Sequence, residues 1–151
     1  MIGFDNLFIS LRPATPADSD FAYQVKKVAL GEYVKKTYGR WDEVFQRTFH
    51  DRQWQPAGTQ IVVASGTDVG WVWCTAHSDH ISVDGLYLLP QYQSRGIGTY
   101  LLSRLRDEAF RAGKSVRLWV MKINPAFRFY KRVGFSVIGE TETHWHMEAK
   151  A

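Results

Sequence analysis

Residues 86–98 read LYLLPQYQSRGIG. An apolar run stops at Pro90, and an apolar run ended by proline is typical of a β-strand. Two closely spaced glycines, Gly96 and Gly98, then lead into a segment with apolar residues at helical spacing. Residues 96–112 are therefore predicted to form an amphipathic helix. Its apolar stripe would be Ile97, Leu101, Leu102, Leu105 and Ala109.

The start of a helix behind two glycines can hold an anion. The first N–H groups of a helix have no partner, and the helix dipole is positive there. Gly96 and Gly98 carry no side chain, so a pyrophosphate can approach the backbone, and Arg95 adds a positive charge. By spacing alone, packing is an alternative reason for the two glycines, since many helices begin after a glycine-rich turn. The segment lacks the Gly-Lys-Ser/Thr of a P-loop, and Leu101 stands where a dinucleotide fold needs a third glycine.

Elements on both sides of this stretch follow from the same patterns. Upstream, we predict a strand at 8–12, a helix opening at Thr15, an irregular segment between Gly31 and Gly39, and a helix from about Asp42 to Trp54. That second helix would turn Val44, Phe45, Thr48 and Phe49 inward. Three strands follow, at 60–64, 69–76 and 80–89. Downstream come a buried strand at 116–121, a short helix that Asn124 caps, and a hairpin of 135–139 with 143–147.

Together with a second segment, the glycine loop resembles a known family. Gln-x-x-Gly-x-Gly at residues 93–98, after the Leu-Tyr-Leu-Leu-Pro strand, resembles the acetyl-CoA-binding motif of the GNAT superfamily of N-acetyltransferases. The segment 124–135, with Asn124-Pro125-Ala126 and Phe129-Tyr130-Lys131-Arg132-Val133-Gly134-Phe135, is similar to its second hallmark. The order and separation of the motifs agree, and so does the order of elements. The resemblance implies an α/β fold, the GNAT acyl-CoA N-acyltransferase fold, with a mixed, mostly antiparallel, splayed sheet and flanking helices.

The resemblance also implies how acetyl-CoA, as co-substrate, would bind. Strand 81–89 would splay from strand 116–121, and main-chain groups of the first would pair with the pantetheine arm and the acetyl carbonyl. Backbone N–H groups of the glycine loop would hold the pyrophosphate and could stabilise a developing oxyanion. The residues implied in cofactor binding are Leu86, Leu88, Gln93, Arg95, Gly96, Ile97, Gly98, Thr99, Asn124 and Tyr130.

Tyr130 is the predicted catalytic acid. In many family members, the tyrosine at this position protonates the departing thiolate. A phenol beside a sulfur whose thiol pKa is about 8.5 is a credible proton donor. The alternative is that Tyr130 is a core ring on a short helix.

The general base and the acceptor site stay open. Asp84 lies on the strand that carries the base in family members, and Glu32 is a second candidate. The irregular segment 31–41 corresponds to the variable acceptor-binding region, so Glu32, Tyr33 and Trp41 are candidate acceptor-binding residues. Each is also a residue type that packs or stays solvated without touching a ligand.

The histidines and the single cysteine suggest no further chemistry. His144 and His146 would share one face of the last strand, but a metal site needs a third ligand and none has suitable local spacing. We therefore predict no metal, while a role for both in the acceptor pocket is conceivable. His50, His77 and His80 are interpreted as surface or turn residues. Cys74 sits in an apolar run, which favours an inert thiol.

Composition sets the class of protein. The 151 residues fit one domain over 1–151. The net charge of +4 favours an anionic partner, but the basic residues form no long run, which argues against nucleic acid. The longest apolar runs are far shorter than the roughly 20 residues that span a bilayer, and no leader is recognised. We expect a cytoplasmic protein without a membrane partner. Many relatives dimerise, yet no patch here can be assigned to a homodimer.

The predicted function is transfer of an acetyl group from acetyl-CoA to a primary amine by direct attack in a ternary complex, since no covalent nucleophile stands out. The acceptor is either a small molecule or a peptide. A non-catalytic acyl-CoA-binding module is the alternative. A nucleic-acid-binding protein is a third hypothesis, which predicts binding that weakens steeply with salt.

Overall fold

The computed structural model of the chain describes residues 2–4 and 6–151. They group into two compact units. The first unit reaches to Trp73 and includes Gly85–Arg95, and the second holds Cys74–Asp84 and Gly96–Ala151. The strands are hydrogen-bonded in the order β1 (Ile2–Phe4), β2 (Leu7–Pro13), β3 (Thr59–Ala64), β4 (Thr67–Ala76), β5 (His80–Leu88), β6 (Ser115–Met121), β8 (His144–Ala149) and β7 (Ser136–Glu140). The prediction of one domain over residues 1–151 remains a prediction.

The first unit is built on antiparallel strands with helices between them. β2 (Leu7–Pro13) pairs with β1 (Ile2–Phe4) and with β3 (Thr59–Ala64), and β3 pairs with β4 (Thr67–Ala76). The predicted strands are found with ends shifted by a residue or two. Between β2 and β3 lie η1 (Pro16–Asp18), α1 (Ser19–Tyr38), α2 (Glu43–Gln53) and η2 (Pro56–Gly58).

Trp71 fixes helix α1 on the strands of the first unit. Its indole N–H donates to the Ala22 carbonyl at 3.0 Å, and its ring packs in a buried cluster with Ala22, Val25 and Ile61. The Tyr87 ring lies 4.9 Å away, centroid to centroid. A buried indole N–H left without an acceptor costs about 1–3 kcal/mol, so this single bond selects how α1 lies on β4.

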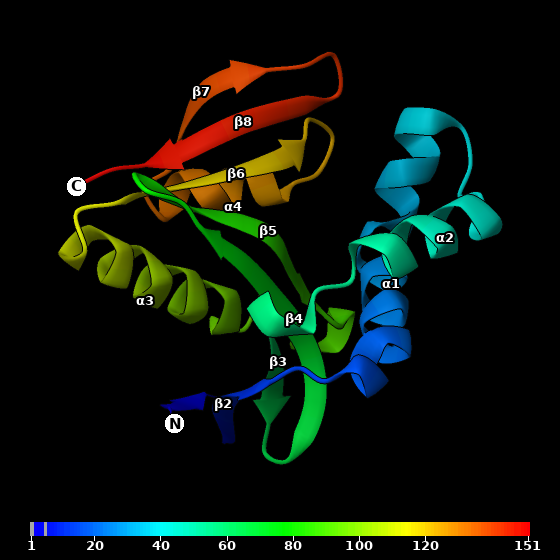
Figure 1. The fold of residues 1–151 in the computed structure, drawn as a ribbon, viewed down its shortest axis with the longest axis horizontal. Helices are drawn as coiled ribbons and strands as arrows, with labels where there is room; N and C mark the ends of the chain where they lie inside the picture. The colour runs from blue at the N-terminus through cyan, green and yellow to red at the C-terminus, as the bar shows by residue number, and fades with distance from the viewer. Residues whose placement is uncertain (1, 5) are drawn as a thin grey trace. The chain divides into compact units, whose positions relative to one another are not determined.

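Helix α1 continues through the segment predicted to be irregular (Figure 1). It passes Gly31 without a break and ends at Gly39, whose φ of 93° is left-handed. Glycine inside a helix costs about 1 kcal/mol relative to alanine. The neighbouring residues include good helix formers, and burial of Val34, which is 8% exposed, offsets that cost. The prediction of an irregular segment is wrong, because glycine weakens a helix but packing decides whether it breaks.

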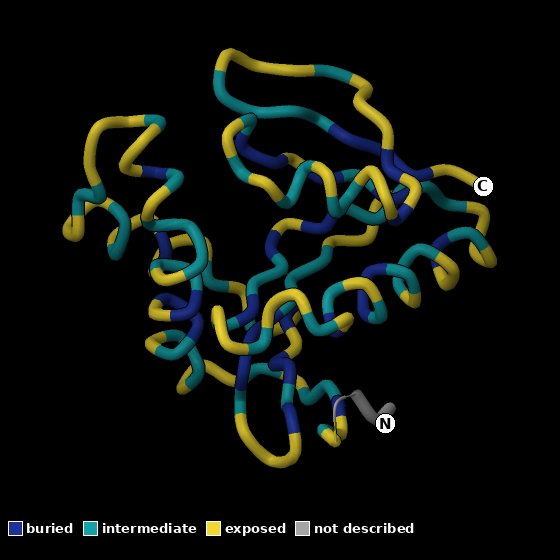
Figure 2. Tube along the Cα trace, turned by 180° about the vertical axis from the view of Figure 1, so that it is seen from behind, coloured by how far each residue is buried: buried dark blue, intermediate teal, exposed yellow. Residues whose placement is uncertain are grey.

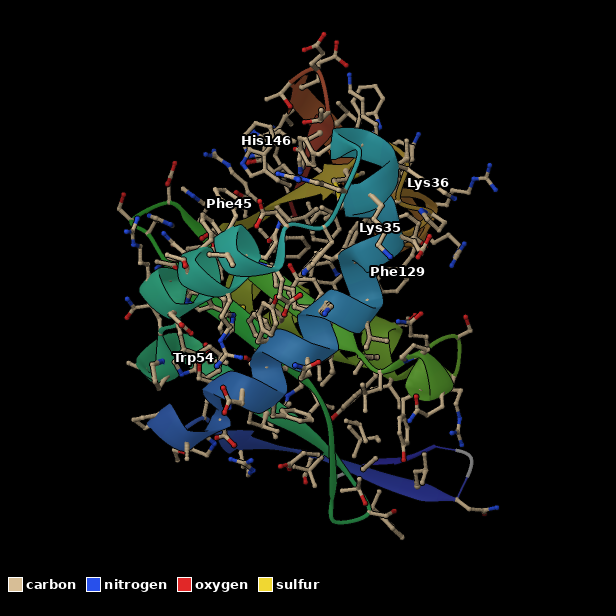
Figure 3. All side chains as sticks on the ribbon, turned by 90° about the vertical axis from the view of Figure 1, so that its right-hand side faces the viewer. Lys35, Lys36, Phe45, Trp54, Phe129 and His146 are labelled. Carbon is tan, nitrogen blue, oxygen red and sulfur yellow. The ribbon has the colours of Figure 1, made fainter. Side chains whose placement is uncertain are left out.

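Helix α2 turns a different face inward from the one predicted. Val44, Phe45, Thr48 and Phe49 are all exposed, and Figure 3 labels Phe45 on this helix. The buried residue is His50, which is 4% exposed. Its Nε2 lies 3.0 Å from the Ser19 carbonyl, and its ring stacks on Trp54. The predictions of an apolar inner face and of a surface His50 are therefore wrong, because the imidazole finds its partner on α1.

The second unit is built around β6 (Ser115–Met121). β6 runs parallel to β5 (His80–Leu88) and antiparallel to β8 (His144–Ala149), which pairs with β7 (Ser136–Glu140). Helices α3 (Ile97–Arg111) and α4 (Ala126–Arg132) both contact β6. Figure 2 shows buried and exposed residues alternating along α3 at helical spacing, which confirms the predicted amphipathic helix. Among the described residues, no helix is both long and apolar enough to cross a membrane.

Strand β6 alternates between buried and less buried residues from Ser115 to Val120. Val116, Leu118 and Val120 are buried, whereas Trp119 is 53% exposed. The prediction of a buried strand is wrong for Trp119, and Arg117 is only half-buried. The signal was present in the sequence, because Arg117 interrupts the apolar run and strand side chains alternate between faces.

Candidate functional site

The glycine loop turns the chain sharply before α3. After η3 (Pro90–Tyr92), the Gln93 side chain donates from Nε2 to the Leu88 carbonyl at 2.9 Å and ties the loop to the end of β5. Ser94 and Gly96 follow with φ of 59° and 86°. The left-handed region costs an ordinary L-residue about 1–2 kcal/mol and glycine nothing. The backbone at 96 therefore calls for glycine.

The start of α3 presents free main-chain donors. The first hydrogen bond of the helix runs from the Tyr100 N–H to the Gly96 carbonyl at 3.0 Å. The N–H groups of Ile97, Gly98 and Thr99 precede it, so they have no acceptor within the helix, and no side chain of the described residues caps the helix start. These donors and the helix dipole suit an anion. The Arg95 guanidinium lies over the Tyr92 ring at 5.8 Å and brings a cation to the loop.

Glycine suits positions 96 and 98 of the motif for different structural reasons. A Cβ at Gly98 would meet the Phe129 ring of α4 at 3.4 Å, which is an ordinary contact. The missing side chain at 98 therefore faces protein, and it is not the opening for a phosphate that the spacing suggested. Gly96 is required by its backbone conformation, and Gly98 contributes its N–H.

The second motif forms the predicted cap and short helix. The Asn124 side chain accepts from the Ala126 N–H at 2.9 Å, and its carbonyl accepts from the Phe127 N–H at 3.2 Å. Pro125 stands at the helix start, where its missing N–H costs nothing. Asn124 thus has the structural role predicted for it.

Tyr130 lies on α4 among aromatic rings. Its ring centroid is 5.3 Å from that of Phe129 and 5.9 Å from that of Phe135. Burial raises the pKa of the Tyr130 phenol to about 12, although part of the residue is accessible. Among the described residues the hydroxyl has no hydrogen-bond partner. A phenol in this state stays protonated at neutral pH and has its proton free to donate.

The other cofactor candidates on β5 lie in the first unit. Leu88 is buried, and its carbonyl is already taken by Gln93. Leu86 is partly exposed, on the stretch of β5 that follows its ladder with β6, whose last pair is Val83 with Leu118. The main chain of Leu86 is therefore the better placed of the two for a new hydrogen bond.

The acceptor candidates prove to be residues of a helix and its end. Glu32, 74% exposed at its side chain, pairs with Lys35 on the same turn at 3.5 Å. Tyr33 follows it on α1 and is half-buried. Trp41 donates from its indole N–H to the Tyr23 hydroxyl at 3.2 Å and to Glu43 at 3.1 Å. Trp41 therefore joins the loop to both helices, a structural role that the sequence did not indicate.

Asp84 lies on the second unit's part of β5. It is exposed and accepts a hydrogen bond from the Thr75 hydroxyl at 2.6 Å. Cys74 nearby is half-buried, and burial raises the pKa of its thiol to about 12, with the charge of Asp84 adding to the shift. A thiol in that state is a poor nucleophile, which agrees with the interpretation of Cys74 as inert.

Sequence comparison points to one family. The sequence profile of the Acetyltransferase (GNAT) family matches residues 27–135. The chain is 30% identical over 112 residues to an uncharacterized N-acetyltransferase of Methanocaldococcus jannaschii. That match covers 68% of this chain and 47% of the relative, so the chain spans about half the length of its curated relative.

Solved structures share the fold at low sequence identity. PaiA N-acetyltransferase from Thermoplasma acidophilum, solved in complex with coenzyme A, has a TM-score of 0.73 at 20% identity, over 95% of this chain and 99% of that one. Naa50 from Arabidopsis thaliana, solved with a bisubstrate analogue, has a TM-score of 0.66 at 17% identity, over 93% and 97%. These neighbours confirm the predicted fold class. With both motifs in place and residues 27–135 matched, the chain belongs to the Acetyltransferase (GNAT) family.

Proposed function

We propose that this chain transfers an acetyl group from acetyl-CoA to a primary amine by direct attack in a ternary complex. The observation that carries the proposal is the start of α3, where left-handed Gly96 leaves the N–H groups of Ile97, Gly98 and Thr99 without helical acceptors. A pyrophosphate is the ligand whose charge and oxygens match such donors. The coenzyme A in the Thermoplasma acidophilum structure supports the same donor for this fold.

Residues of β5, the glycine loop and the second motif would each bind a part of acetyl-CoA. Gln93 and Arg95 would hold the loop and supply a positive charge beside the pyrophosphate, while Leu86 and Leu88 would bind the pantetheine arm through main-chain groups. Asn124, besides its cap, would contact that arm. The N–H donors of α3 cost no reorganisation on binding, because the helix already fixes them.

Two proton transfers complete the reaction. Acetyl-CoA supplies the acetyl group as a thioester, whose carbonyl carbon a neutral amine attacks. The new C–N bond forms, the C–S bond breaks, and Tyr130 gives its proton to the departing sulfur. The amine's proton passes to a base, for which Asp84 is the exposed carboxylate on β5. Glu32, Tyr33 and Trp41 are proposed to contact the acceptor.

The deciding experiment measures thiol release across a panel of amines. Tyr130→Phe removes a hydroxyl that has no partner among the described residues, so we expect an unchanged melting temperature and coenzyme A affinity. We expect kcat to fall about 100-fold, the lower end for a general acid, because a thiolate leaves readily. Tyr100→Phe is the control, since it removes a tyrosine hydroxyl on α3 that accepts a hydrogen bond from Arg104 at 3.3 Å.

Other results would change the assignment. Unchanged turnover in Tyr130→Phe would remove Tyr130 as the acid. Coenzyme A binding without thiol release from any amine would favour a non-catalytic acyl-CoA-binding module. Loss of coenzyme A binding in Tyr130→Phe would make the hydroxyl a binding group.

A further inference from the structure

The end of helix α4 is closed by a hydrogen-bonded turn. Gly134 is left-handed, with a φ of 106°, and its N–H donates to the Lys131 carbonyl at 3.1 Å. The Phe135 N–H donates to the Tyr130 carbonyl at 3.0 Å. These two bonds form a Schellman motif, a common way to end a helix at a glycine. The carbonyl of Val133, a residue that is 5% exposed, takes no part in them and needs a donor from elsewhere.

Arg106 of helix α3 supplies that donor. Its Nη1 donates to the Val133 carbonyl at 2.6 Å. Asp107 accepts from Nε and Nη2 of the same guanidinium at 3.2 and 3.1 Å, so the planar group is held by two partners. The Arg106 side chain is only 28% exposed, and its charge lies at the negative end of the α4 dipole. Charge, geometry and partial burial thus all favour this contact.

Helices α3 and α4 meet at two places. Near the start of α3, the Cβ position of Gly98 faces the ring of Phe129 on α4, a residue that Figure 3 labels. Arg106 joins the two helices about two turns further along α3. Helix α4 has only 7 residues, and a helix shorter than about 12–15 residues is marginal by itself. The position of α4 therefore depends on contacts with its neighbours, and α3 supplies two of them.

The Tyr130 phenol takes its position from α4. Its hydroxyl has no hydrogen-bond partner among the described residues. The rings that it packs against, Phe129 and Phe135, lie on α4 or shortly after its end. Because these contacts are local, the phenol moves with α4. Its place relative to α3 is thus set by the contacts that join the two helices.

We propose that Arg106 is a positioning residue, which fixes Tyr130 relative to the start of α3 by holding the end of α4. The role in catalysis rests on the proposed function, in which α3 binds the pyrophosphate and Tyr130 protonates the departing sulfur. That step requires the phenol within hydrogen-bond reach of the sulfur. A misplacement of about 1 Å can cost about 100-fold in rate. Arg106 joins the helix that binds the donor to the helix that carries the acid.

Arg106→Met removes the guanidinium and keeps most of the apolar stem. We expect a lower melting temperature, because the buried Val133 carbonyl loses its donor. At a temperature where the variant is fully folded, we expect kcat for thiol release to fall about 10-fold. Coenzyme A affinity should stay within about two-fold of wild type, since the main-chain donors of α3 remain in place. The loss in kcat should not exceed the about 100-fold expected for Tyr130→Phe, because Arg106 acts through Tyr130.

Arg104→Met is the matched control. It removes the same charge from the same helix, but Arg104 is 58% exposed at its side chain and pairs with Glu108 of α3 itself at 3.2 Å. We expect this variant to keep the kcat of wild type. Arg106→Lys keeps a charge and a donor, but an ammonium cannot reproduce the planar fork that serves two partners. Its kcat should therefore recover in part.

A double-variant cycle separates positioning from a loss of stability. Arg106→Met is also made in Tyr130→Phe, which has no phenolic proton left to place. We expect it to lower the residual kcat of Tyr130→Phe by less than about two-fold, so that the two effects do not add. An equal loss in both backgrounds, or an unchanged kcat in Arg106→Met, would overturn the role in catalysis. Coenzyme A binding weakened as much as kcat would instead make Arg106 a support of the donor site.

Tyrosine ring resonances test the position of Tyr130 without any turnover. In protein with isotope-labelled tyrosine rings, the Tyr130 signal is identified by its loss in Tyr130→Phe. We expect this signal to shift in Arg106→Met, to return toward wild type in Arg106→Lys, and to stay in place in Arg104→Met. No shift in Arg106→Met would refute the proposal.

This measurement also distinguishes failure of the proposal from failure of the proposed function. If no amine supports thiol release, or if Tyr130→Phe keeps full turnover, the proposed reaction or its acid is wrong. The ring resonances still decide whether Arg106 sets the position of Tyr130, because they need neither acetyl-CoA nor an acceptor.

Discussion

The two glycines of the loop are expected to respond in opposite ways to alanine. Gly96 has a φ of 86°, so Gly96→Ala forces an L-residue into the left-handed region at a cost of about 1–2 kcal/mol. Either the protein loses that stability or the loop relaxes and moves the donors of α3. We expect a lower melting temperature and coenzyme A binding weaker by about 5- to 30-fold, which is the same energy expressed as an affinity.

Gly98→Ala places its new methyl group against protein. The Cβ would lie 3.4 Å from the nearest Phe129 ring atom and 4.0 Å from the next two, which are ordinary contacts. Gly98 is the second residue of α3, where alanine favours the helix by up to about 1 kcal/mol. We expect an equal or higher melting temperature and a coenzyme A affinity within about two-fold of wild type, since the N–H stays in place.

Calorimetric titration with coenzyme A and thermal unfolding of both variants give the answer. Gly31→Ala serves as the control, because it is the same substitution inside α1 with nothing within 4 Å of the added Cβ. Wild-type coenzyme A affinity in Gly96→Ala would refute the assignment of this loop as the phosphate site. Strong loss of binding in Gly98→Ala would show that its side-chain position faces the cofactor after all.

Three further predictions concern stability and ionisation. Burial lowers the pKa of His50 below the ordinary 6.5, so the unfolded chain binds a proton more readily than the folded one. The free energy of unfolding should therefore fall as the pH drops below about 6.5. Denaturant titrations of wild type and His50→Gln should give free energies of unfolding that converge at low pH. Gly70→Ala would put a Cβ 2.2 Å from the Tyr87 carbonyl oxygen and should destabilise by about 3 kcal/mol or more, seen as a drop in the denaturation midpoint without a change in slope. Since burial raises the pKa of the Cys74 thiol to about 12, iodoacetamide at pH 8 should modify the native protein far more slowly than the urea-unfolded chain; equal rates would contradict the burial.

The local elements were largely predictable because their signals lie close together in the chain. Apart from Gly31, proline and glycine ended segments where they were expected, and the stripe of α3 and the Asn124 cap followed from spacing alone. Gly31 was misjudged, because a glycine lowers helix stability by about 1 kcal/mol and packing of Val34 outweighs it. The prediction of the buried face of α2 was also wrong because of a tertiary contact, since the partner of the His50 imidazole is the Ser19 carbonyl on another helix.

By itself the sequence determined the family and predicted the donor side of the site. Two motifs with fixed spacing, at 93–98 and 124–135, are enough for both inferences. The helix start, the cap and the tyrosine lie within these short segments, so local spacing alone reveals them. Only the tertiary structure decided that the side-chain position of Gly98 faces Phe129, and that the rings of Trp119 and His146 stack across β6 and β8. These residues meet across strands and helices, and the register that brings them together depends on packing between distant segments, which no local pattern contains.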